Sequence, residues 1–241
     1  YDLKDHRVMR TIAWPGDVPS FFANIQFAPD GKHMYLFVDQ AVVAYDTDTF
    51  AQVDKWELGG AVQDGFGRLE LGSRDDTLYD EPGYYTALFT VTDPIVQRRT
   101  LGVGHVNLAA KTVDFFAVGP AMPVGARGTA GEPLTFTLAP GRKVAYGLFQ
   151  EFGRSEFWKF DLEHRRLAGP HGNEFRGRPR MNLKTSSNGK VLYIYTAGNT
   201  IDLWDAETYQ YLRSITLDGD ATTALFVLPT PPMSMSAPSA Q

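Results

Sequence analysis

The sequence predicts an all-β fold assembled from repeated four-stranded antiparallel units. Aromatic residues make up 13% of the 241 residues and there are 23 glycines, which favours pleated strands joined by tight turns. A glycine-containing turn followed by an apolar strand recurs along the chain, and a polar residue suited to cap a turn recurs after the next strand. Helical periodicity is not convincing in any segment.

The repeating unit has a fixed order of features. A turn containing Gly precedes an apolar strand, and a second strand ends in an aromatic residue followed by Asp, as in 27–49, 138–164 and 183–208. Residues that tolerate positive φ, such as those of Asp30-Gly31-Lys32, suit tight hairpins. The Asp that ends the second strand can cap the following turn with its carboxylate. The strand 34–38 is apolar on both faces, as expected where sheets pack on either side.

The capping residue also gives the period of the repeat. It is found at Asp2, Asp46, Asn107, Asp161 and Asp205, which are separated by 44, 61, 54 and 44 residues. A base period of 44 residues fits a four-stranded blade of about 40–45 residues. The two longer steps indicate insertions near 74–83 and 119–132.

The period therefore predicts a β-propeller with blades at about 21–58, 66–118, 134–167 and 181–217. Residues 1–12 are expected to form the outer two strands of an earlier blade, and 221–229 one further strand. Residues 1–229 would then be a partial propeller of about four and a half blades, seven-bladed if complete. A flexible Pro/Ser-rich tail is expected at 230–241. An open stack of sheets is the alternative, and it is disfavoured because it exposes sheet edges.

Composition excludes several kinds of site. The chain has no cysteine, which excludes disulfides, thiol nucleophiles, thiolate-bound metals and haem attached through Cys-x-x-Cys-His. Its 28 acidic and 23 basic residues give no basic footprint for nucleic acid. No apolar run approaches the roughly 20 residues that span a bilayer, so a soluble chain is expected. The opening residues 1–5 are typical of the middle of a strand pair, so further residues, including any signal peptide, are expected upstream.

The order of the segments resembles the β subunit of the quinohemoprotein amine dehydrogenases, a branch of the YVTN-type β-propellers. The resemblance covers about residues 80–225. It rests on the strand 85–91 and the turn at Asp93-Pro94, on the strand pair 104–116, on the following blades, and on the closing stretch 217–223 (Leu-Asp-Gly-Asp-Ala-Thr-Thr). This chain departs from the family pattern in one respect, because a complete family propeller has about two more blades upstream.

The resemblance implies that this chain is a supporting subunit and that the cofactors are carried by other subunits. Members of the family are periplasmic, and their propeller packs against a dihaem cytochrome subunit and a small subunit that carries cysteine tryptophylquinone. By resemblance, the chain is a non-redox subunit that walls the quinone site for primary-amine oxidation, while haem c and the quinone belong to its partners. The lack of cysteine agrees with that division of labour.

The insertion at 73–85 is a candidate amine pocket. Four carboxylates could attract a cationic amine, and two tyrosine rings could provide cation–π contacts: Asp75, Asp76, Asp80, Glu81, Tyr84 and Tyr85. The alternative is a solvated acidic loop, as surface loops usually are. The aspartates lack the ligand spacing of a calcium loop.

The basic stretch at 163–180 is a candidate interface. Arginines are enriched at protein interfaces, and an aromatic residue offers an anchor; the residues are Arg165, Arg166, Phe175, Arg176, Arg178 and Arg180. The alternative is a solvated connector between blades.

The sequence predicts neither catalytic residues nor a metal site. The five histidines form no ligand cluster, and no nucleophile elbow or phosphate-binding loop is present. The glycines at 102 and 104 are expected at strand bends. A stand-alone propeller of the YVTN type that binds a protein or ligand is the second hypothesis, and a lactonase-type hydrolase the third.

Overall fold

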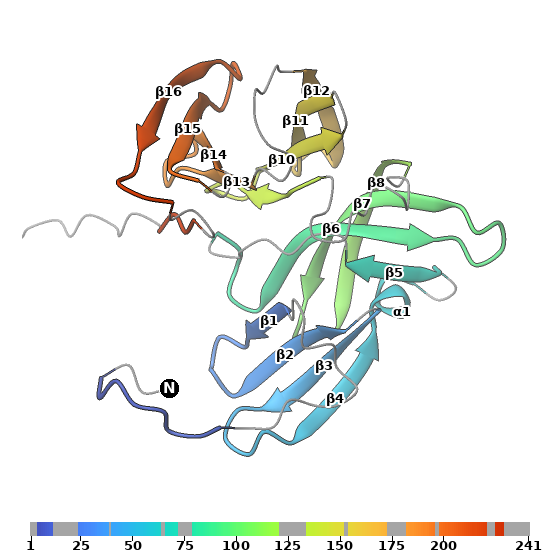
Figure 1. The fold of residues 1–241 in the computed structure, drawn as a ribbon. Helices are drawn as coiled ribbons and strands as arrows, with labels where there is room; N and C mark the ends of the chain where they lie inside the picture. The colour runs from blue at the N-terminus through green and yellow to red at the C-terminus, as the bar shows by residue number, and fades with distance from the viewer. Residues whose placement is uncertain are drawn as a thin grey trace, which may run out of the picture. The chain divides into compact units, whose positions relative to one another are not determined.

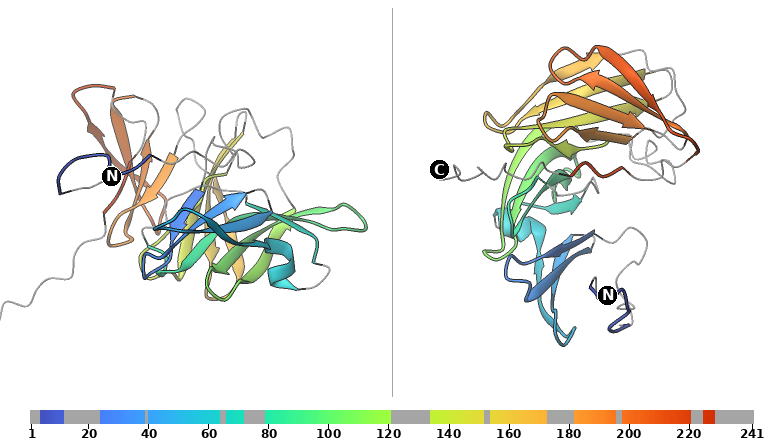
Figure 2. Two further views of the ribbon diagram at one scale, coloured as in Figure 1. Left: turned by 90° about the horizontal axis from the view of Figure 1, so that it is seen from below. Right: turned by 90° about the vertical axis from the view of Figure 1, so that its left-hand side faces the viewer.

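A computed structural model describes residues 4–11, 24–38, 40–63, 66–71, 79–120, 134–151, 154–172, 182–195, 198–220 and 225–228. Its strands form four antiparallel sheets of four strands each (Figures 1 and 2). In every sheet, strands that follow one another in sequence are hydrogen-bonded neighbours. The chain is therefore all-β, with the blade topology of a β-propeller, which confirms the predicted fold class.

The first two sheets belong to one compact unit, made of Tyr1–Arg74 and Glu81–Ala121. The first sheet contains β1 (Asn24–Phe27), β2 (His33–Val38), β3 (Ala41–Asp46) and β4 (Gln52–Glu57). A short helix, α1 (Leu58–Val62), follows. The second sheet contains β5 (Arg68–Leu71), β6 (Tyr84–Thr92), β7 (Arg99–Asn107) and β8 (Thr112–Pro120).

The last two sheets belong to the other unit, made of Asp75–Asp80 and Met122–Gln241. The third sheet contains β9 (Thr137–Leu138), β10 (Val144–Glu151), β11 (Arg154–Asp161) and β12 (Arg166–Gly172). The fourth contains β13 (Asn182–Thr185), β14 (Val191–Tyr195), β15 (Thr200–Asp205) and β16 (Tyr211–Thr216).

Each unit has its own apolar core between its two sheets. In the first unit, Phe37 of β2 packs against Tyr85 of β6, with ring centroids 4.5 Å apart. In the second, Leu148 and Phe157 of the third sheet cluster with Trp204 of the fourth. Because successive residues of a strand point to opposite faces, each inner strand places every second residue in such a core.

The predicted capping residues occupy the same position in all four sheets, at the end of the third strand. The carboxylate of Asp46 accepts the amides of Asp48 and Thr49 at 3.1 and 2.7 Å. Asn107, Asp161 and Asp205 likewise accept amides two or three residues downstream, at 2.7–3.0 Å. These four caps are therefore confirmed as the residues that order the turn before the fourth strand, whereas the fifth predicted cap, Asp2, lies outside the described residues.

A second hydrogen bond ties this turn to the first hairpin of the same sheet. The amide after each capping residue donates to a carbonyl in the turn between the first and second strands, at 2.9–3.0 Å. The donor and acceptor pairs are Thr47 and Lys32, Leu108 and Gly83, Leu162 and Lys143, and Ala206 and Lys190. The repeat is thus a repeat of hydrogen bonds as well as of sequence.

The fifth residue of each capped turn has a positive φ although none of them is glycine. These residues are Phe50, Lys111, Arg165 and Tyr209, with φ of 54° to 59°. Gln97, which follows a fifth such cap at Asp93, has a φ of 55°. Sequence reasoning missed these positions, because it looks for glycine where the backbone enters this region.

Both ends of the described chain differ from the prediction. Residues 4–11 contain no strand, only one bridge position at Arg7, and residues 225–228 are irregular. Apolar side chains become buried in a strand only when a sheet lies beside them, whereas Phe226 and Leu228 are 66% and 73% exposed. The predicted tail at 230–241 lies outside the described residues. In the described part of the chain, no helix is long and apolar enough to cross a membrane.

Candidate functional site

The second sheet carries a cluster of polar and aromatic side chains at one end of β6 and β7. Tyr84 lies opposite Asn107 in the register, and Thr86 lies opposite His105, so the four residues share one face. The ring of Tyr84 stacks on the imidazole of His105, with centroids 4.7 Å apart and an interplanar angle of 10°. We call these four residues the Tyr84 cluster.

Hydrogen bonds fix the rings of the Tyr84 cluster. Asn107 Nδ2 donates to the phenol oxygen of Tyr84 at 3.0 Å, and Thr86 Oγ1 lies 2.8 Å from His105 Nδ1. All four side chains are half-buried. The cluster therefore presents ordered aromatic and hydrogen-bonding groups, which suit recognition of a planar or cationic group.

Asn107 has two tasks, which explains why this sheet has Asn where the other three have Asp. Its Oδ1 accepts the amide of Ala110 at 2.9 Å and caps the turn. Its Nδ2 donates a hydrogen bond to the phenol oxygen of Tyr84. An aspartate carboxylate could not donate this bond, because it carries no proton. The capping position and the Tyr84 cluster are thus joined through one side chain.

The structure divides the predicted amine-pocket residues. Tyr84 belongs to the cluster, but Tyr85 is 1% exposed and packs in the core against Phe37. As neighbours in one strand, the two tyrosines point to opposite faces and do not line a common pocket. Glu81 begins the turn into β6, where its carbonyl accepts the amide of Tyr84 at 2.9 Å.

Three aspartates of the insertion were also predicted to line the pocket. Asp80 belongs to the other compact unit. Asp75 and Asp76 lie outside the described residues. A pocket made of all six predicted residues therefore stays a prediction.

The predicted interface is described only at its beginning. Arg165 occupies the positive-φ position of the turn between β11 and β12. Arg166 Nε lies 3.3 Å from Asp161 Oδ2, and His164 Nδ1 lies 2.9 Å from the same oxygen. Asp161 therefore offsets part of the positive charge here. The rest of the stretch, Phe175, Arg176, Arg178 and Arg180, lies outside the described residues.

Local hydrogen bonds depress the pKa of several carboxyls. The amide of Thr49 followed by its hydroxyl lowers the pKa of Asp46, and the same groups of Thr208 lower that of Asp205. The hydrogen bond from Lys111, 2.5 Å away, lowers the pKa of Asp54. Burial raises the pKa of Tyr209 and Tyr146. These shifts accompany turns and the core and do not mark a proton-transfer site.

Two glycines of β7 allow rings to lie directly over the strand. A Cβ on Gly104 would lie 2.6 Å from the ring of Phe89, and one on Gly102 would lie 2.2 Å from the ring of Phe115. The sequence predicted strand bends at these two glycines. The signal for ring packing was two glycines spaced two residues apart and flanked by the apolar residues Leu101 and Val103.

Among the described residues, no group of three or more His, Asp or Glu side chains could hold a metal ion. The Tyr84 cluster, with two ordered rings and polar partners, is the strongest candidate for a binding role in this part of the chain.

No family model matches the sequence, and no curated protein matches it. Among solved structures, the chain is similar to a luciferin-regenerating enzyme, at 13% identity and a TM-score of 0.48, over 81% of this chain and 62% of that one. It is similar to the hydrazine synthase of Kuenenia stuttgartiensis, at 10% identity and a TM-score of 0.40, over 83% and 67%. It is also similar to the Dos1 propeller, at 9% identity and a TM-score of 0.47, over 83% of this chain and 49% of that one. The chain thus spans about half to two thirds of the length of these structures.

Proposed function

We propose that the chain is a non-redox propeller subunit of a periplasmic complex similar to the quinohemoprotein amine dehydrogenases. In this proposal it walls the quinone site for primary-amine oxidation, and its partners are a dihaem cytochrome subunit and a small quinone-bearing subunit. The observation that carries the proposal is the stacked pair of Tyr84 and His105, because it supplies an ordered aromatic wall directly after the acidic insertion.

The Tyr84 cluster has the chemistry that a primary ammonium group requires. Aromatic faces attract cations, and the carboxylate of Glu81 adds negative charge nearby in sequence. The hydrogen bond from Asn107 to Tyr84 and the one between Thr86 and His105 keep the rings in place before an amine arrives, which reduces the cost of ordering them on binding. The quinone of the partner would supply the oxidant, and the residues of this chain bind and orient the amine.

A second function is favoured by a different observation. Five turns share one hydrogen-bonded frame capped by Asp or Asn, while the residues displayed on them differ. A constant frame with variable residues is what a stand-alone protein- or ligand-binding propeller of the YVTN type requires.

One purification separates the two functions. The full chain is tagged in its native host, and the eluate is tested for haem-stained subunits and amine-dependent dye reduction. The proposal expects both. A chain that elutes without a haem-stained partner and without dye reduction would contradict it and leave the stand-alone scaffold.

The role of the Tyr84 cluster is tested in the same complex. Tyr84→Phe removes the hydroxyl that Asn107 holds, so the amine KM is expected to rise about 2- to 10-fold while the haem content stays constant. The control is Tyr211→Phe, which removes a hydroxyl bonded to Ser214 at 2.8 Å in the fourth sheet. Equal KM values for both variants and the parent complex would exclude the cluster from the amine site.

A further inference from the structure

We propose that the turn 93–98 between β6 and β7 is a docking element for a partner protein. It would insert Ile95 and Val96 into an apolar pocket whose rim carries carboxylates. This inference is independent of the amine dehydrogenase proposal, because it rests on the geometry of one turn.

Ile95 and Val96 are unusual in their exposure. Their side chains are 87% and 67% exposed, and they are adjacent at the tip of the β6–β7 hairpin, whose two strands have 9 residues each. The turn extends beyond the end of β5 in two views (Figures 1 and 2). Single exposed apolar residues are common, but an adjacent branched pair at a projecting tip is a candidate contact site.

The turn is rigid, so the exposed pair is held in a fixed position. Asp93 Oδ1 accepts the amides of Ile95 and Val96, both at 2.8 Å. The amide of Gln97 donates to the carbonyl of Asp93 at 3.1 Å, and the amide of Asp93 donates to Arg98 at 2.9 Å. The Gln97 side chain donates to the carbonyl of Pro94 at 3.1 Å. Such a frame lowers the ordering cost of binding, because the backbone of the turn is already held in place.

The other capped turns provide an internal comparison. In the β6–β7 turn, the second and third positions after the cap are Ile95 and Val96. The corresponding pairs are small or polar; they are Asp48-Thr49, Ala109-Ala110, Glu163-His164 and Glu207-Thr208. Four turns show that the frame does not require large apolar residues at these positions. The pair at 95 and 96 therefore needs a reason other than folding of the turn.

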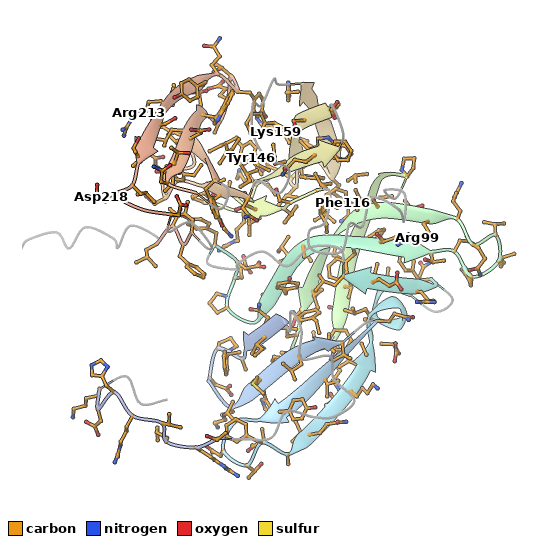
Figure 3. All side chains as sticks on the ribbon, in the orientation of Figure 1. Arg99, Phe116, Tyr146, Lys159, Arg213 and Asp218 are labelled. Carbon is orange, nitrogen blue, oxygen red and sulfur yellow. The ribbon has the colours of Figure 1, made fainter. Side chains whose placement is uncertain are left out.

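Charge around the turn indicates the chemistry of the partner. Arg98 is exposed beside the tip, and Arg68 lies at its base, opposite Thr92 in the register. Arg99, labelled in Figure 3, starts β7. The nearby carboxylates are engaged, since Glu70 lies within 4.0 Å of Arg68 and Arg99 and Asp93 caps the turn. Three arginines against the two carboxylates of Glu70 and Asp93 leave one net positive charge around the turn, and this charge favours an acidic rim around the apolar pocket.

Site-specific photo-crosslinking tests the proposal directly. The tagged full chain carries p-benzoylphenylalanine at position 95 in its native host, and the matched control carries it at 207, the same position of the Asp205 turn. The expected result is one discrete protein adduct from position 95 and none from 207. Mass spectrometry should place the crosslink in an apolar segment flanked by Asp or Glu.

A binding measurement with the crosslinked partner completes the test. The double variant Ile95→Ser/Val96→Ser should weaken binding at least about 10-fold, mainly through faster dissociation. Arg98→Glu should slow association, and this effect should shrink as salt rises. The control Ala109→Ser/Ala110→Ser changes the same positions of another turn in the same sheet and should bind like the parent.

Three outcomes would overturn the proposal. They are an absence of adduct at position 95, adducts of equal yield at 95 and 207, and a crosslink into lipid. A vesicle of phosphatidylglycerol that binds the parent but not the double serine variant would likewise assign the turn to a membrane surface. Melting midpoints of all variants confirm that each is folded.

Discussion

One carboxylate oxygen of Asp205 accepts two hydrogen bonds from the single residue Thr208, from its amide at 2.7 Å and from its hydroxyl at 3.0 Å. Asp46 and Thr49 repeat this arrangement in the first sheet, at 2.7 and 2.8 Å. The same pair of residue types thus closes the same turn in two sheets that lie in different compact units.

Removal of these caps is expected to destabilise the fold. Asp46→Ala and Asp205→Ala each leave turn amides without their acceptor and should lower the melting midpoint by roughly 2–4 °C. Asp48→Ala is the matched control, because the amide of Asp48 donates to Asp46 and does not depend on the side chain. If the two cap variants have the same melting midpoint as the control, the caps do not contribute to stability.

The same caps should make stability sensitive to acid. Their pKa values are lowered in the folded chain, for Asp46 and Asp205 first by a backbone amide and then by a threonine hydroxyl. A folded pKa below the unfolded value of about 3.9 gives stability that is present above that pH and lost as pH falls through the folded pKa. The melting midpoint should therefore drop below about pH 4.

Asparagine at the cap isolates this contribution. Asp46→Asn/Asp205→Asn keeps an oxygen acceptor, as Asn107 does naturally in the second sheet, but carries no titratable proton. The fall of the melting midpoint between about pH 5 and pH 3 should be smaller in this variant than in the parent. Parallel curves for the two proteins would show that the caps do not cause the acid sensitivity.

Sequence reasoning succeeded where the signals are local. A Gly turn, an apolar strand and an Asp cap lie within about 45 residues, so their recurrence predicts four-stranded units without knowledge of the packing. It failed where the register of the strands decides which side chains lie on the same face of a sheet. Tyr84 and Tyr85 were grouped because they are adjacent in sequence. Successive side chains of a strand point to opposite faces, so Tyr84 lies in the Tyr84 cluster and Tyr85 lies in the core. His105 was not singled out, because its partners Tyr84 and Thr86 lie on another strand.

The glycines of β7 offer a test of the core. Gly104→Ala would place a Cβ 2.6 Å from the ring of Phe89, and overpacking of this kind costs about 1–3 kcal/mol. Gly119→Ala in β8 is the control, since a Cβ there meets no atom within 4 Å. The free energy of unfolding from urea titration measures both. A Gly104→Ala variant as stable as the Gly119→Ala variant would show that Phe89 does not need this space.

Visible absorption spectra test the proposal that the chain supports redox chemistry carried by partner subunits. The chain purified alone should show no band above the protein absorption, since it has no cysteine for a thioether-linked haem or a cysteine-based quinone. The assembly purified from the native host should show haem c bands that become reduced when a primary amine is added. A chromophore on the isolated chain, or an assembly whose spectrum does not respond to any primary amine, would contradict the proposed function.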